Sequence, residues 1–206
     1  GQNTFQGGGT PGTVNFADSD ITSGGVSNIY QSELQGIGAG TNIVLEAGDY
    51  ISTSGTFNEE RVMLAPNSNL VMRTRNGSGD NGTNQGINLT TSSHVAALEF
   101  KTQGSGTITL ETGGFGSSQV ANIAVGKLTT SGGVVSLAAK NSNSQIIMPA
   151  GAQIASGGGN ITLQADNMSF TGGTTPSIFA GNGEVWLRPT AASVVLGQGA
   201  NDANGI

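Results

Sequence analysis

Residues 157–189 read GGGNITLQADNMSFTGGTTPSIFAGNGEVWLRP and contain one short unit twice. The unit is a glycine-containing turn followed by a β-branched residue, one spacer and a leucine. Ile161 and Leu163 form it first, and Val185 and Leu187 form it again. Apolar residues that alternate in this way are typical of a β-strand with one buried face. The stretch therefore predicts a protein built from repeated short strands.

The same β-branched residue, spacer and leucine recur earlier in the chain. The unit begins at Ile87, Ile108, Val135, Ile161 and Val185. A period of roughly 20–30 residues without an intervening helix indicates a solenoid. Each coil of three short strands would pair with the next in a parallel ladder about 4.8 Å away. We expect an all-β fold, a parallel β-helix (β-solenoid) of about six to seven coils.

The alternation also predicts which side chains face the core. The expected inward residues are Ile108, Leu110, Val135, Leu137, Ala139, Ile161, Leu163, Ala165, Val185 and Leu187, preceded by Ile43, Leu45 and Ala47. An antiparallel sandwich also has short, closely spaced strands and is the alternative architecture. A sandwich gives no reason for the same unit to return at a regular interval, and the solenoid is therefore favoured.

Residues 1–39 differ from the rest of the chain. In residues 1–20 a glycine-rich hinge separates the only apolar anchors, Phe5, Val14 and Phe16, which suggests an entry strand, an arm that reaches a neighbouring subunit, or a flexible leader. Residues 21–39 are expected to form a short cap or lead-in segment, with at most one helical turn through Ile29, Leu34 and Ile37. Residues 40–206 would form the β-solenoid.

Composition argues against several functions. The formal net charge is −6 and only seven residues are Lys or Arg. We therefore expect no nucleic-acid partner, because binding to phosphates requires clustered cations. The chain has no cysteine, which excludes disulfides and thiolate metal sites. It contains no apolar run long enough for a transmembrane helix, so no membrane span is expected.

Two segments resemble the repeats of a known family. They are LQGIGAGTNIVLEAGDYI (34–51) and, within residues 157–201, the ordered motifs ITL-x-AD, I-x-AGNG, V-x-LRPT and V-x-LG. These are similar to the repeats of filamentous-haemagglutinin-like, two-partner-secreted bacterial exoproteins. The resemblance implies a right-handed parallel β-helix in an extracellular stalk or fibre used for adhesion or surface coating. The family's amino-terminal secretion domain is not evident, so the chain is expected to be a fragment or a small relative that builds length by polymerising.

No catalytic, cofactor or metal site is predicted, and we expect no enzyme activity. Polysaccharide-cleaving β-helices need two or three carboxylates close together, whereas the acidic residues here are dispersed. His94 lies at an ordinary strand start. Residues 76–86 are similar to a calcium-binding repeat, but Asp80 is their one acid, which favours a surface loop.

One outward row is a candidate contact with a partner or a sugar. Gln164 and Arg188, like Glu46 and Glu111, follow an inward leucine and so point outward. Stacked coils would place Gln164 beside Arg188. Trp186 lies between two inward residues and is expected to face outward too. The alternatives are a solvated ladder for the row and packing under a loop for Trp186.

The ends of a solenoid expose strand edges, which pair with other chains unless a cap covers them. Residues 198–206 offer no substantial cap, so we expect head-to-tail self-association, which yields a filament. The leading hypothesis is an extracellular structural or adhesive protein of the bacterial cell surface, which stacks head-to-tail or forms part of a longer fibre. The alternatives are a carbohydrate-binding module with surface glycans as partners, and a polysaccharide-degrading β-helix enzyme.

Overall fold

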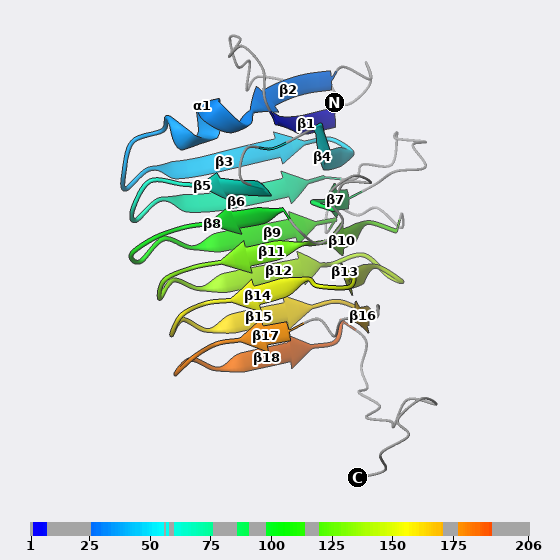
Figure 1. Ribbon diagram of the computed structural model, residues 1–206. Coiled ribbons are helices and arrows are strands. Elements are labelled where there is room, and N and C mark those ends of the chain that lie inside the picture. The colour runs from blue at the N-terminus through cyan, green and yellow to red at the C-terminus, as the bar shows by residue number, and fades with distance from the viewer. Residues whose placement is uncertain are drawn as a thin grey trace.

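The computed structural model of the protein describes residues 2–7, 26–55, 57, 60–75, 86–90, 98–113, 120–170 and 177–190. Three parallel sheets wrap around one axis, and successive strands of the chain pass from sheet to sheet (Figure 1). The described strands form five complete coils and the first strand of a sixth. The predicted right-handed parallel β-helix is confirmed, with somewhat fewer coils in the described part than the six to seven expected. The last of the repeat motifs, V-x-LG at residues 194–197, lies outside the described residues.

Each sheet takes one strand from each coil. Sheet A contains, in spatial order, β2 (Val26–Tyr30), β1 (Gln2–Gly7), β4 (Tyr50–Gly55), β7 (Gly86–Asn88), β10 (Asn122–Ala124), β13 (Gln145–Met148) and β16 (Asn167–Phe170). Sheet B contains β3 (Asn42–Ala47), β6 (Asn69–Thr74), β9 (Ile108–Thr112), β12 (Val135–Ala139), β15 (Ile161–Gln164) and β18 (Val185–Arg188). Sheet C contains β5 (Arg61–Met63), β8 (Glu99–Lys101), β11 (Lys127–Thr129), β14 (Gln153–Ala155) and β17 (Ser177–Phe179).

The register of sheet B confirms most of the repeat read from the sequence. Ile108 pairs with Val135, which pairs with Ile161, which in turn pairs with Val185. Ile87 was placed wrongly in this series. It lies in β7 of sheet A, between Ile51 and Ile123. An alternation of only three residues is compatible with a strand in any of the three sheets. The sequence pattern could therefore not show which sheet Ile87 joins.

The strand that precedes β9 in sheet B is β6, where Leu70 is the partner of Ile108. The step along the chain from Leu70 to Ile108 is longer than every other step between paired strands of sheet B. This longer second coil contains residues 76–85 and 91–97, which lie outside the described part of the chain. A solenoid tolerates such insertions because they leave the paired strands in register.

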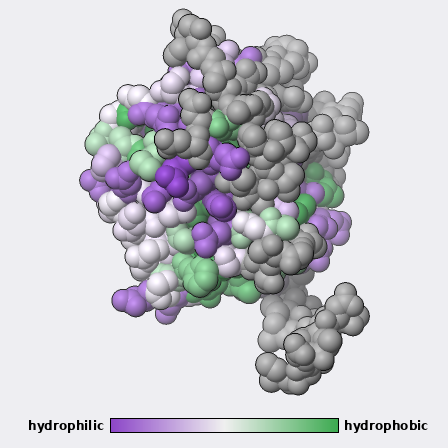
Figure 2. Space-filling view, in the orientation of Figure 1, coloured by the Kyte–Doolittle hydropathy of each residue, from purple (hydrophilic) through white to green (hydrophobic). Residues whose placement is uncertain are grey.

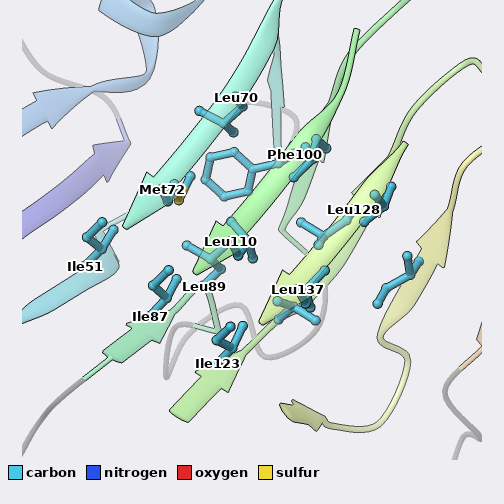
Figure 3. Packing of buried hydrophobic residues seen from close by; sticks show 14 of the residues in the cluster. Ile51, Leu70, Met72, Ile87, Leu89, Phe100, Leu110, Ile123, Leu128 and Leu137 are labelled. Carbon is cyan, nitrogen blue, oxygen red and sulfur yellow. The ribbon is translucent and has the colours of Figure 1, made fainter. Parts of the chain in front are cut away.

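Alternate side chains of all three sheets fill one continuous core. Ile43, Leu45 and Ala47 are buried while Val44 and Glu46 are exposed, as predicted. In sheet C, Val62, Phe100, Leu128 and Ile154 follow one another in register and are fully buried. Side chains from β6, β8 and β9 point toward the same interior (Figure 3). Burying each such side chain contributes roughly 1.5–3 kcal/mol, so the core along the axis is the main stabilising term.

A short helix, α1 (Gln31–Gln35), lies over the N-terminal end of this core (Figure 1). Leu34 of this helix is buried, and Ile29, which lies in β2 rather than in the helix, is buried as well. Gln31 Nε2 donates to the carbonyl oxygen of Arg61 at 2.6 Å. That bond satisfies a carbonyl of β5, the terminal strand of sheet C at this end. The predicted helical element is therefore present and covers a sheet edge.

Residues 2–7 are part of the chain's own sheet. β1 pairs in parallel with β2 on one side and with β4 on the other, and Phe5 is in register with Ile29 and Thr53. Its strand is therefore held within the same chain. Val14 and Phe16 lie outside the described residues, so the arm expected from residues 1–20 stays a prediction, as do the boundaries at residues 20 and 39.

A column of glycines fixes the distance between coils at one corner. Gly106, Gly133, Gly159 and Gly183 each come two residues before the first inward residue of a sheet B strand. A Cβ on any of them would lie closer than 3.0 Å to a backbone carbonyl oxygen of the preceding coil. Coils about 4.8 Å apart leave no room there for a side chain. This close approach is the reason for the glycine that precedes β9, β12, β15 and β18.

Buried hydroxyl groups close the same corner. Thr102 Oγ1 donates to the carbonyl oxygen of Gly106 at 2.8 Å, and Thr130 Oγ1 donates to that of Gly133 at 2.5 Å. Ser156 makes the equivalent bond to Gly159. Each hydroxyl is buried and satisfied, as buried polar groups must be to avoid a desolvation cost. The turns into β9, β12 and β15 are therefore held by a side chain as well as by the backbone.

Replacing a glycine of the column should destabilise the fold. In the Gly133→Ala variant the new methyl group would collide with the backbone of the preceding coil, and we expect a loss of about 1–3 kcal/mol in the free energy of unfolding. Gly38→Ala is the matched control, because a Cβ there meets nothing within 4 Å. Urea unfolding followed by circular dichroism measures both. Equal unfolding midpoints for the two variants would contradict the column.

Candidate functional site

The outward face of sheet B carries a ladder of alternating charge. Glu46, Arg73 and Glu111 follow one another in register on β3, β6 and β9. Arg73 Nη1 lies 3.4 Å from Glu46 Oε1, and Arg73 Nε lies 3.9 Å from Glu111 Oε2. Arg75 and Lys140 form further ion pairs with Glu46 and Glu111. The carboxylates on this face are thus neutralised by cations.

Arg73 was missed in the sequence reasoning. The residue follows Met72, which occupies the inward position that leucine fills in most other coils, and its partners depend on the longer step between β6 and β9. The outward placement predicted for Glu46 and Glu111 is correct. Exposed ion pairs of this kind contribute about 0–1 kcal/mol each to the free energy of unfolding. The ladder is therefore better interpreted as a solvated surface than as a binding site.

Sheet C holds one carboxylate in a more sheltered position. Glu99 Oε2 accepts from Arg61 Nε at 2.6 Å, and the Glu99 side chain is only 14% exposed. Burial raises the pKa of Glu99. Hydrogen bonds from Thr129 and Arg61, with the charges of Arg61 and Lys101, outweigh that effect and hold the pKa below its ordinary value. Glu99 is therefore a stabilising anion between two coils.

The three residues predicted to contact a partner or a sugar lie together on the last two strands of sheet B. Gln164 on β15 is in register with Arg188 on β18, as expected. Trp186 is in register with Thr162, and its Nε1 donates to Glu184 Oε2 at 2.9 Å. The Arg188 guanidinium lies 4.4 Å from the centre of the indole ring. One face of the tryptophan is therefore occupied by an arginine, in a cation–π contact.

The core is exposed at the C-terminal end of the described solenoid. Val185 and Leu187 occupy inward positions, yet they are 43% and 54% exposed, while their partners Ile161 and Leu163 are fully buried. The inward prediction was right in register, but no described coil lies beyond β18 to cover these side chains. Phe170 of β16 is exposed for the same reason, since its partner Met148 is fully buried.

We call this the C-terminal end surface: Phe170, Val185 and Leu187, with Phe179 and Trp186 at its rim. Figure 2 shows hydrophobic colouring at the lower end of the described molecule, over β17 and β18. The opposite end has α1 over its core, with Ile29 and Leu34 buried. The two ends are therefore chemically different. The repeat motif does not reveal this difference, because the last repeat looks like the others.

Several residues considered from the sequence lie outside the described part of the chain, namely His94, Asp80, Val14 and Phe16. Among the residues that the structure describes, no group of three or more His, Cys, Asp and Glu side chains is arranged to hold a metal ion. The described helix is too short to cross a membrane.

Comparison with known proteins finds no matching family model, no similar curated protein and no similar solved structure. The likeness to filamentous-haemagglutinin-like repeats therefore stays a prediction from the motifs.

The lowered pKa of Glu99 predicts a loss of stability in acid. As the pH falls, the unfolded chain binds this proton first, because its glutamate titrates near the ordinary value of about 4.3. The stabilisation by Glu99 is thus present above that pH and is lost as the pH falls through the folded pKa. Glu99→Gln should lower the urea midpoint at neutral pH and approach wild type in acid.

The matched control is Glu46→Gln, which removes an exposed carboxylate from sheet B. This variant keeps Glu99 and should keep its acid-dependent loss of stability. A wild-type midpoint that stays above that of Glu99→Gln by the same amount at neutral and acid pH would contradict the assignment.

Proposed function

We propose that the chain is a structural and adhesive segment of an extracellular bacterial surface fibre, without catalytic activity. One observation carries the proposal. The core is continuous through every described coil and is still open at the C-terminal end surface, where Val185 and Leu187 occupy core positions without a described coil beyond them. A rod of this kind gains length by adding coils, which is the property a stalk or fibre requires.

The outer faces support the same proposal. Three described glutamates are engaged in ion pairs: Glu46 and Glu111 with Arg73, and Glu99 with Arg61. A general acid or base must be free to exchange a proton with a substrate. The outer faces also carry amide and hydroxyl side chains, among them Asn42, Asn69 and Thr107, which supply polar cover where charges are few.

Part of a longer fibre fits the geometry better than simple head-to-tail stacking. In a head-to-tail polymer, the C-terminal end surface of one copy would meet the N-terminal end of the next. There, α1 lies over β5, so only the edges of β2 in sheet A and β3 in sheet B are terminal and outside α1. Sheet C could not continue unless the helix moved. We therefore favour a rod segment in which α1 closes sheet C at the N-terminal end.

The location can be tested in cells that make the protein. Antibodies raised against the purified chain, with gold labelling and electron microscopy, should decorate fibres or a coat outside the cell envelope. A matched preimmune serum is the control. Label confined to the cell interior would overturn the proposal.

A carbohydrate-binding module is the second candidate, and the exposed Trp186 favours it. The indole is 42% exposed, and Arg188 and Gln164 offer hydrogen-bond donors beside it. Sugars are commonly bound by an aromatic ring with polar groups at its edge. Surface glycans are then the proposed partners.

Trp186→Ala should abolish saturable binding to a glycan array if this second function holds. Val44→Ala is the matched control, because Val44 is an outward, similarly exposed residue on β3 of the same sheet. Binding that survives in Trp186→Ala, or that fails equally in Val44→Ala, would contradict the assignment.

A further inference from the structure

The three cations of sheet C lie on its outward face, one in each of three successive coils. Arg61 is on β5, Lys101 on β8 and Lys127 on β11. Arg61 and Lys127 are both in register with Glu99, which lies between them. Lys101 follows Glu99 by two residues on β8, so both side chains point to the same side of the sheet. We call Arg61, Lys101 and Lys127 the cation stripe.

The cation stripe contains one carboxylate, which is shielded from solvent. The Glu99 side chain is 14% exposed, while that of its partner Arg61 is 39% exposed. Among the residues that the structure describes, Lys101 and Lys127 form no ion pair. Glu60 precedes β5, at the end of the stripe away from Lys127, and the sequences of β11, β14 and β17 contain no acid. The surface around the two lysines is therefore positively charged, although the chain as a whole is negative.

Cations on sheet B, in contrast, are neutralised within the chain. Lys140 pairs with Glu111, and Arg73 pairs with Glu46. The two lysines of the cation stripe have no such partner in the described part of the chain, so their ammonium groups are available to a ligand. Lysine side chains bury their stems along a surface and keep the charged end in water. Figure 2 shows hydrophilic side chains in view on this side of the molecule, over β8 and β11.

The spacing of the cation stripe selects an elongated ligand. Successive coils are about 4.8 Å apart along the axis, and each of three coils supplies one cation. A hexuronic acid residue in an extended polysaccharide carries one carboxylate and advances by a similar distance. Carboxylates on one side of an extended peptide recur only every two residues, roughly 6.6 Å apart. A polysaccharide laid along the solenoid axis therefore matches the stripe better than an acidic peptide does.

The net charge of the chain does not prevent this contact. At an ionic strength of 0.15 M the screening length is about 8 Å, so carboxylates on other faces act weakly on a polymer held against sheet C. An ammonium group in direct contact with a carboxylate is screened much less. Each exposed pair is weak by itself, and binding depends on several pairs that form at once along one polymer.

We propose that the outward face of sheet C binds a linear polyuronate, an acidic polysaccharide with one carboxylate per sugar. Lys101 and Lys127 bind successive carboxylates, and Arg61 lies at the end of the stripe. The site is on a different face from Trp186, and neither end of the solenoid takes part in it. It goes beyond the proposed function, because it holds whether or not the protein belongs to a surface fibre.

Isothermal titration calorimetry on the purified full chain gives the first test. We expect saturable binding of polygalacturonate that weakens as sodium chloride is added. Among oligogalacturonates, affinity should rise steeply up to three residues, the number of coils in the stripe, and more slowly beyond. Dextran is the neutral control, and poly-L-glutamate is the acidic control with a different spacing. No binding of polygalacturonate, or equally tight binding of poly-L-glutamate, would overturn the proposal.

Paired substitutions test the residues. Lys101→Gln combined with Lys127→Gln should raise the dissociation constant for polygalacturonate roughly ten-fold or more. The matched control is Arg75→Gln combined with Lys140→Gln, which changes the net charge equally but on sheet B. That control should stay within about two-fold of wild type, because its charges are distant and screened. Equal losses in the two double variants would show an effect of net charge alone and would overturn the site.

Two further measurements keep the result separate from other causes. Circular dichroism shows whether each double variant folds. Trp186→Ala should bind polygalacturonate as wild type does, because Trp186 lies on sheet B. Loss of polygalacturonate binding in Trp186→Ala, with binding retained in the double variant of the stripe, would place the acidic polysaccharide at Trp186 and overturn this proposal.

Discussion

The close approach of successive coils at the glycine column is the constraint on which the rest of the structure depends. At Gly106, Gly133, Gly159 and Gly183 the backbone of one coil lies against the carbonyl of the preceding coil, and no side chain fits between them. The buried hydroxyls of Thr102, Thr130 and Ser156 hold the turn that makes this approach. Because β9, β12, β15 and β18 begin directly after this corner, the corner sets the register in which their apolar residues stack.

That register has one consequence for the core and one for the outer surface. It aligns inward positions into a continuous core, and it aligns outward positions into columns whose members come from different coils. Glu46, Arg73 and Glu111 form an ion-pair ladder in this way, and Gln164, Arg188 and Trp186 form a polar and aromatic group at the end of the same sheet. In the first of these columns the charges of the two glutamates are balanced by Arg73 between them.

The same stacking makes the ends unequal and gives the molecule its functional character. A solenoid has no closed core of its own, so each end must be capped, continued or joined to a partner. At one end α1 covers β5 and buries Leu34. At the other, Val185 and Leu187 keep core positions but remain exposed. The two ends of the described solenoid are therefore different: α1 covers sheet C at one, and core positions of sheet B are exposed at the other.

The sequence by itself determined the solenoid, the inward and outward alternation and the stacking of Ile108, Val135, Ile161 and Val185, because period and alternation are local properties of the chain. It also placed Gln164 beside Arg188. Only the tertiary structure assigned Ile87 to sheet A, paired Arg73 with two glutamates, and showed which end is covered. These features depend on how much chain each coil inserts between strands and on what lies beyond a coil. A repeat motif encodes neither, since the last coil has the same pattern as one buried in the middle.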